Sequence, residues 1–159
     1  MRHRYQRSQR SQHGFSLIEL LVVITIILII VSIAIPALQN AQLNMRETAV
    51  IKEVQTIAQA ETQYASQFGK YAPTLLELGP PVAGVSGPQA AFLIPRSLAK
   101  GEKDGYVFTL AVADSGYQVH ANPKTFGSTG RRTFYLDQNG IVHQNWGREP
   151  ATDNSPEIE

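Results

Sequence analysis

Residues 14–20 read Gly-Phe-Ser-Leu-Ile-Glu-Leu and lead into the longest uncharged stretch of the chain, which follows Glu19. After Glu19 no charged residue occurs until Arg46, and most of the residues between them are Leu, Ile or Val. An ionised carboxylate at the centre of a bilayer costs about 2.5–3.5 kcal/mol on insertion scales. A glutamate inside a membrane segment is therefore treated as functional, and the group that pairs with it indicates what the protein does.

The residues that precede this stretch form a basic leader. Residues 1–14 contain no Asp or Glu and four arginines, namely Arg2, Arg4, Arg7 and Arg10. Basic residues in front of an apolar segment hold that end of the chain in the cytoplasm and direct the remainder outward. Residues 15–38 would form a helix of roughly 36 Å, which is long enough to cross a hydrocarbon core of about 30 Å. The sequence therefore predicts one membrane-spanning segment at residues 15–38.

The stretch at residues 14–20 resembles the processing site of type IV pilins and of the pseudopilins of type II secretion systems. The resemblance implies that a prepilin peptidase cuts after Gly14 and that the new N-terminal residue, Phe15, is N-methylated. It also implies that Glu19 approaches the free amine of a neighbouring subunit in a filament. An α-amine has a pKa of about 8 and is charged at neutral pH. In a low-dielectric filament core each charge would offset the burial of the other, and the pair would fix the register of the subunits.

Three other interpretations of this region remain open. Glu19 lies near the end of the apolar segment and could snorkel toward cytoplasmic water. Residues 1–34 could be an ordinary secretory signal, because Ser32 and Ala34 are small residues at the positions that signal peptidase recognises. The segment could also be a plain single-span anchor. The glutamate inside the apolar region, and a helical pattern that continues past residue 34, favour the prepilin interpretation.

Helical periodicity continues beyond the apolar segment to about Phe68. One face carries residues at spacings of three and four, namely Val50, Val54, Ile57, Ala58, Glu61, Ala65 and Phe68. Charged residues are expected on the water-facing side or in subunit contacts, namely Arg46, Glu47, Lys52 and Glu53. Gly69 occupies the position of a C-terminal cap. Pro36 removes one backbone hydrogen bond, at a cost of about 3 kcal/mol in a helix interior, and predicts either a gentle kink or local melting when subunits pack.

The remainder of the chain is expected to form a loop followed by a sheet. Glycines and prolines interrupt residues 69–104, which predicts a connecting αβ loop with short helical turns. Residues 105–146 show the alternation of strands, with predicted turns at residues 114–116 and at 138–140. The pair Asn139-Gly140 is a strong hairpin signal, because both residues tolerate a positive φ. Residues 147–159 lack periodicity and are expected to lie loosely on the surface or to be disordered.

The predicted fold class is therefore α+β, the architecture of the pilin fold. The first half of a long N-terminal helix spans the membrane, and its second half packs on a roughly four-stranded antiparallel sheet. The expected segments are a cleaved leader (1–14), a transmembrane or filament-core half-helix (15–38), an amphipathic half-helix (39–68), the αβ loop (69–104), the sheet (105–146) and the tail (147–159).

The residue pattern argues against catalysis, and no catalytic residue, cofactor or metal site is predicted. His120 and His143 fall on predicted strands without acidic or sulfur ligands at a suitable spacing, so solvent-facing or edge positions are favoured. Asp137 and Asn139 form only a fragment of a calcium loop of the kind that major pseudopilins carry, and an exposed polar turn is favoured there. Neither a nucleophile elbow nor a phosphate-binding glycine loop occurs.

The charge balance argues against one class of partner, and the cysteine content excludes one structural feature. The chain of 159 residues has 14 Lys and Arg and 13 Asp and Glu, so removal of the four leader arginines leaves ten basic residues against 13 acidic ones. This balance argues against a nucleic-acid surface, in spite of the pair Arg131–Arg132. The chain has no cysteine. A disulfide-closed C-terminal loop, which many type IV pilins have, is therefore impossible.

The sequence thus predicts a type IV pilin-like structural subunit for adhesion, motility or DNA uptake. One alternative is a major pseudopilin of a type II secretion system, and another is a bitopic membrane protein whose soluble domain binds a ligand. The resemblance implies a single-pass inner-membrane precursor with a cytoplasmic N-terminus, followed by a pilus at the cell surface or a periplasmic pseudopilus. The implied partners are other copies of the chain, the prepilin peptidase and methylase, an inner-membrane assembly platform, minor pilins, and membrane lipid before assembly.

Overall fold

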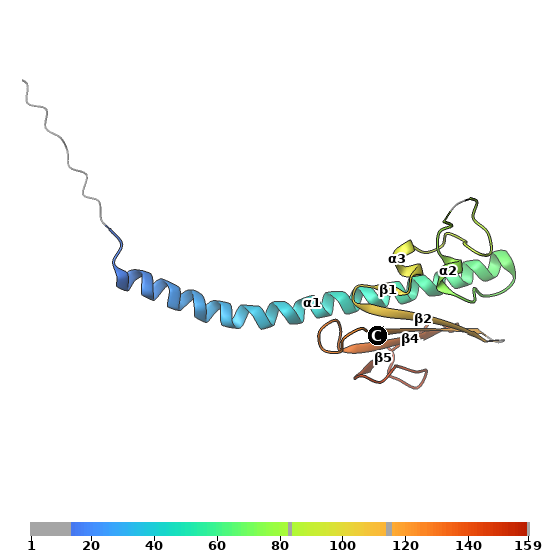
Figure 1. The fold of residues 1–159 in the computed structure, drawn as a ribbon. Helices are drawn as coiled ribbons and strands as arrows, with labels where there is room; N and C mark the ends of the chain where they lie inside the picture. The colour runs from blue at the N-terminus through green and yellow to red at the C-terminus, as the bar shows by residue number, and fades with distance from the viewer. Residues whose placement is uncertain (1–13, 83, 114–115, 159) are drawn as a thin grey trace, which may run out of the picture. The chain divides into compact units, whose positions relative to one another are not determined.

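The computed structural model describes residues 14–82, 84–113 and 116–158, so most of the predicted leader lies outside the described residues. The chain divides into two compact units, Met1–Gln39 and Asn40–Glu159. The longest element, helix α1 (Leu17–Phe68), contributes residues to both units (Figure 1).

The described part of the first unit consists of residues 14–39. Helix α1 begins at Leu17 and continues through Pro36 without interruption. Melting at this proline was expected only when subunits pack together, so it stays a prediction. All side chains of residues 14–39 are exposed, although most of them are apolar. By length and composition alone, α1 contains a segment that is apolar enough to cross a membrane. An apolar surface of this extent is normally covered by lipid or by another molecule.

In the second unit, α1 presents one buried stripe to the domain core. Its buried residues recur at spacings of one, three and four, namely Leu43, Glu47, Val50, Val54, Ile57, Ala60, Glu61 and Tyr64. The predicted stripe is therefore present, with Ala58, Ala65 and Phe68 half-buried at its edges. The helix ends where Gly69 adopts a φ of +72° and donates its N–H to the Ala65 carbonyl at 2.9 Å. Glycine reaches this conformation without a Cβ clash.

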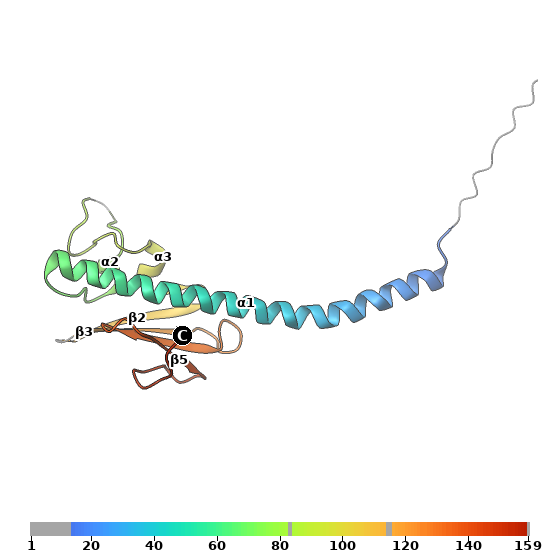
Figure 2. The ribbon, with the colours of Figure 1, turned by 180° about the vertical axis from the view of Figure 1, so that it is seen from behind.

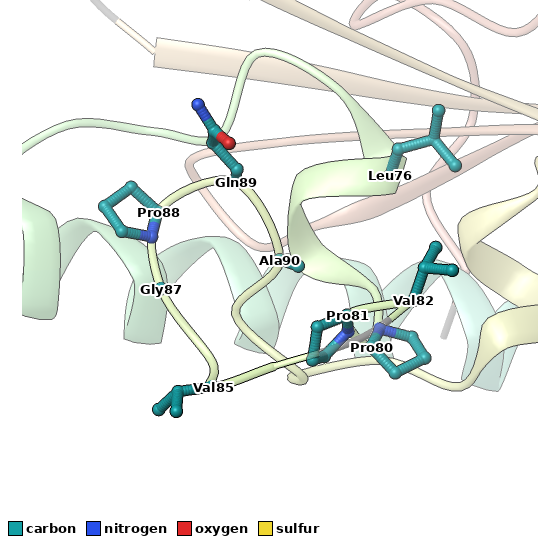
Figure 3. Close-up of a pocket in the computed structure, with 9 residues that line it drawn as sticks. All are labelled: Leu76, Pro80, Pro81, Val82, Val85, Gly87, Pro88, Gln89 and Ala90. Atoms are coloured by element: carbon teal, nitrogen blue, oxygen red, sulfur yellow. The ribbon is translucent and has the colours of Figure 1, made fainter.

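The αβ loop contains two single-turn helices, α2 (Leu75–Leu78) and α3 (Arg96–Ala99). It is fixed to the core by buried apolar side chains, namely Ala72, Leu75, Leu78, Ile94 and Leu98. The Tyr64 hydroxyl of α1 donates to the Pro88 carbonyl at 2.6 Å. The loop also encloses an open pocket of about 630 Å³, shown in Figure 3, where the side chains of Val82 and Val85 point away from each other and are almost fully exposed.

The sheet has five antiparallel strands in sequential order, and the predicted α+β architecture is confirmed. The strands are β1 (Glu102–Lys103), β2 (Tyr106–Ala113), β3 (Gly116–Pro123), β4 (Arg132–Asp137) and β5 (Val142–Trp146). Strands β2 to β5 correspond to the four predicted strands. The predicted turn at residues 138–140 is present, with a φ of +78° at Gly140, whereas residues 114–115 of the other turn lie outside the described residues.

The sheet has one strand more than the four that were predicted. The additional strand is β1, whose residues were expected in the αβ loop. Gly101 and Gly105 have φ values of +76° and +81°, and Asp104 between them has a φ of 51°. These conformations fold Glu102–Lys103 back onto β2, with Lys103 opposite Tyr106. A strand of two residues is too short to show alternation in a sequence.

One face of the sheet packs against the buried stripe of α1 and contributes most of the apolar core. Its buried members alternate along the strands, namely Tyr106, Phe108, Tyr117, Val119, Ala121, Phe134, Leu136 and Val142. The side chains between them, such as those of Thr133, Tyr135 and Asp137 on β4, are also buried. The second face of β4 is therefore covered as well.

The C-terminal segment provides this cover. Most of residues 148–157 are exposed on the surface, and the segment is held to the sheet at defined points. Ala151 is fully buried, and the Thr133 hydroxyl donates to the Glu149 carbonyl at 2.8 Å. The segment then returns along the outer edge of β5, where Gln144 N–H donates to the Pro156 carbonyl at 2.8 Å (Figure 2). In both bonds the C-terminal segment contributes a backbone carbonyl, which is why the side-chain periodicity of the sequence does not reveal them.

Candidate processing and assembly site

The first turn of α1 is closed by a reciprocal cap between Ser16 and Glu19. The Ser16 N–H donates to Glu19 Oε2 at 2.9 Å, and the Ser16 hydroxyl accepts from the Ile18 N–H at 3.3 Å. These contacts satisfy two backbone donors that have no partner within the helix. The carboxylate also lies at the end of the helix where the backbone dipole favours negative charge. Glu19 therefore has a local role at the start of the helix.

The sequence contained a signal for this cap. Ser-x-x-Glu in front of an apolar run is the signature of a capping box. The expectation for Glu19 rested on its charge and on the family resemblance of residues 14–20, so this second role was missed. Among the contacts of the described residues, Glu19 uses only Oε2. A carboxylate accepts hydrogen bonds at both of its oxygens, so Oε1 is available to another donor.

The bond between Gly14 and Phe15 lies outside the helix. Both residues are exposed, with 87% of Phe15 accessible, and α1 starts only at Leu17. A side chain added at Gly14 would meet no atom within 4 Å. Packing among the described residues therefore gives no reason for a glycine at this position. An enzyme could reach the bond without unwinding α1.

Two glutamates of α1 are fully buried, although Glu47 was expected on the water-facing side or in a subunit contact. Glu47 Oε2 accepts from Arg132 Nε at 2.8 Å, and its Oε1 accepts from the Arg131 N–H at 2.7 Å. Arg132 also donates from Nη1 to Gln144 at 2.8 Å. This network attaches α1 to the start of β4. The helical spacing from Leu43 to Val50 places Glu47 on the buried stripe, and only its charge suggested exposure.

Glu61 is the second buried glutamate, and it binds the beginning of the αβ loop. Its Oε2 accepts from the Ala72 N–H at 2.9 Å, whereas Oε1 is buried without a hydrogen-bond partner. Burial raises the pKa of Glu61 to about 7, the Ala72 bond opposes this shift, and the charge of Glu77 adds to it. The carboxyl group therefore titrates near neutral pH.

This titration predicts a domain that loses stability as the pH rises. A group whose pKa is raised by folding stabilises the fold fully below its ordinary pKa, here 4.5, and that contribution disappears as the pH rises through the folded-state value of about 7. The loss should be on the order of 3 kcal/mol. Glu61→Gln keeps an oxygen for the Ala72 N–H and should remove most of this pH dependence.

Thermal unfolding at pH 5 and pH 8 measures the effect. The wild-type Tm should fall between these values, whereas the Glu61→Gln Tm should fall much less. Glu149→Gln, at an exposed carboxylate, serves as the control and should follow the wild type. Equal pH slopes for Glu61→Gln and the wild type would contradict the assignment.

The remaining sequence candidates do not converge on a catalytic or metal site. Asp137 is buried rather than exposed, and it accepts from the Asn139 N–H at 2.9 Å and from the Asn139 side-chain amide at 3.1 Å. His120 and His143 flank Tyr135 and are half-buried beside the C-terminal segment. Burial lowers the pKa of His120. Within residues 14–82, 84–113 and 116–158, no group of three or more His, Cys, Asp or Glu side chains could hold a metal ion.

Comparison with known sequences identifies the N-terminal region. Residues 9–35 match the prokaryotic N-terminal methylation motif. The match contains Gly14, Phe15, Glu19 and the greater part of the apolar segment. No curated protein and no solved structure matches the chain.

Proposed function

We propose that this chain is the structural, non-enzymatic subunit of a surface filament of the type IV pilus class. The methylation motif at residues 9–35, which is typical of type IV pilins and type II secretion pseudopilins, and the α+β pilin-like fold support this proposal. The observation that carries the proposal is the carboxylate of Glu19 in the first turn of an exposed apolar helix.

The proposed sequence of events starts from a membrane precursor, with which the apolar helix and the motif are consistent. The motif implies processing by a prepilin peptidase. We place the cut between Gly14 and Phe15, where the bond lies outside α1, and we place N-methylation on the new Phe15 amine. The leader arginines would hold residues 1–14 on the cytoplasmic side until the cut.

Cleavage creates the cation that Glu19 requires. The Phe15 amine of one subunit would pair with the Glu19 carboxylate of another, and the capped geometry supports this because one carboxylate oxygen remains available. In the apolar interior of a filament, an unpaired charge of either sign is costly, so assembly would be favoured only in the register that pairs them. The same helix would be solvated by lipid before assembly and by other copies afterwards. The assembly platform and minor pilins remain proposed partners on the basis of the family resemblance.

The pseudopilin alternative shares the helix and the cleavage motif, and it differs in what the C-terminal half should bind. A calcium site would need free acidic ligands near Asp137. Asp137 and Asp153 are the acidic residues that line the pocket there, and among the described residues no group of three or more His, Cys, Asp or Glu side chains could hold a metal ion. This arrangement supports the pilus more than the calcium-binding pseudopilus. The bitopic alternative predicts a retained leader or a cut at another position.

Replacement of Gly14 by Val is expected to leave the leader attached in most of the protein. The reason is recognition by the peptidase, because the added side chain would meet nothing within 4 Å in the folded chain. Intact mass of the membrane fraction measures the outcome. Gly87→Val, at another glycine whose added side chain would meet nothing within 4 Å, is the control and should be processed normally. Normal processing of Gly14→Val would refute the placement of the cut.

A further inference from the structure

The sheet carries guanidinium groups at one end of β4 and carboxylates at the other. We call the first the arginine end. It consists of Arg131, Arg132 and Arg148 with the rings of Phe126 and Trp146. Arg132 lies 4.9 Å and Arg131 6.0 Å from the Trp146 ring centroid, and Arg148 lies 5.6 Å from that of Phe126.

At the arginine end, the three arginines outnumber the acidic residues that neighbour them. The buried Glu47 pairs with Arg131 and Arg132. Arg148 is exposed and forms no ion pair among the described residues. Besides Glu47, the acidic residue next to this end is Glu149, which directly follows Arg148 in the chain. Trp146 is 63% exposed. Exposed Trp beside Arg is the composition of protein–protein contact residues, since both give large contact areas.

The opposite end of the sheet, which we call the carboxylate end, consists of Asp137 and Asp153. Both residues line a pocket of about 420 Å³, together with Gln118, Asn139 and two tyrosines. The residues that line it include no Lys, Arg or His. Burial raises the pKa of Tyr135, and the charges of Asp137 and Asp153 raise it further. The two carboxylates therefore act on the same hydroxyl.

Along β4 the two ends are too far apart for their side chains to pair within one chain. β4 runs from Arg132 to Asp137, which separates its ends by roughly 17 Å at about 3.3 Å per residue. The C-terminal segment runs between the same two ends, with Arg148 beside Phe126 and Asp153 beside the carboxylate pocket. A contact between these ends of different copies joins unlike surfaces, and such a heterologous contact extends into a helical filament when its rotation does not close into a ring.

We propose that the arginine end of one copy docks on the carboxylate end of the next, with Arg148 placed against Asp153 and the pocket beside Asp137. This inference rests on the proposed function, because it specifies a contact between the second units of neighbouring copies in the filament. The partner is a second copy of this chain, whose processed form has more acidic than basic residues. The contact complements the Glu19 pairing, since it involves the second unit only.

Cysteine cross-linking tests the contact directly, because the chain has no cysteine of its own. Arg148→Cys and Asp153→Cys variants are co-expressed, and membrane and filament fractions are oxidised. A disulfide-linked dimer should form only when both variants are present. Lys52→Cys with Arg148→Cys is the control pair and should give no dimer, because Lys52 is exposed on α1 outside both ends. Absence of the Arg148–Asp153 dimer in both fractions would overturn the proposal.

Charge reversal gives the second measurement. Arg148→Glu should lower filament yield by at least about tenfold, because it places a like charge opposite two carboxylates. Arg148→Lys should assemble, and the reciprocal pair Arg148→Glu with Asp153→Arg should recover most of the yield. Wild-type yield from Arg148→Glu would refute the contact and show that Arg148 has no role in assembly. Failure of the reciprocal pair to recover the yield would refute the contact in favour of another anionic partner. A cut at a bond other than Gly14–Phe15 would count against the proposed processing alone, since the cross-link is read in the membrane fraction as well.

Discussion

Glu19→Val is expected to abolish filament assembly while membrane insertion stays intact or improves. Insertion should improve because the substitution removes a charge from an apolar segment. Assembly should fail because the Phe15 amine of the neighbouring subunit would lose its proposed partner in a low-dielectric core, at a cost of several kcal/mol per subunit. The yield of sheared filaments, measured against the membrane pool, should fall by far more than tenfold.

Two matched variants separate the charge of Glu19 from its role in the cap. Glu19→Gln keeps an acceptor for the Ser16 N–H, as Gln does in capping boxes, but has no charge. It should therefore assemble as poorly as Glu19→Val. Ser16→Ala weakens the cap by about 1 kcal/mol and keeps the charge, so it should assemble. Filaments at the wild-type level from Glu19→Val would mean that the carboxylate only snorkels toward water.

Glu47→Ala is expected to destabilise the second unit by about 3–5 kcal/mol, the usual effect of removing one partner of a buried ion pair. The substitution would leave the Arg132 guanidinium and the Arg131 N–H without the carboxylate that accepts from both at present. It would also leave a cavity between α1 and β4. Denaturant unfolding of the full chain in detergent measures the change in the free energy of unfolding.

The exposed pair of Glu102 and Lys124 provides the control. Both side chains are about half accessible, and Glu102→Ala should cost less than about 1 kcal/mol. A Glu47→Ala effect no larger than that of Glu102→Ala would show that the buried network does not hold α1 on the sheet.

The parts of the fold that follow from local periodicity were predictable from the sequence. The end of α1 at Phe68 follows from the apolar stripe and Gly69, and strands β2 to β5 follow from alternation and from Asn139-Gly140. The fold class, which is confirmed, was predictable for the same reason. Each of these signals acts over a few residues, where side-chain pattern and backbone conformation are directly related.

The missed features depend on partners that are distant in sequence or on backbone bonds. Glu47 is buried because it meets Arg131 and Arg132, which lie far along the chain. Residues 147–158 are ordered by backbone bonds to β5 and by the burial of Ala151, neither of which leaves a periodic pattern. The Ser16–Glu19 cap differs from these, since its motif was visible and local. At the candidate site, the roles of Gly14, Phe15 and Glu19 stay predictions, and the structure added how Glu19 is held.

We propose that the chain is cut after Gly14 to create the amine that pairs with Glu19 in a filament. The intact mass of filaments sheared from the cell surface is the decisive measurement, because one spectrum reports cleavage, methylation and location. We expect a single species with the mass of residues 15–159 plus one methyl group. A species with the mass of residues 1–159, or of a chain cut at another bond, would refute the proposal.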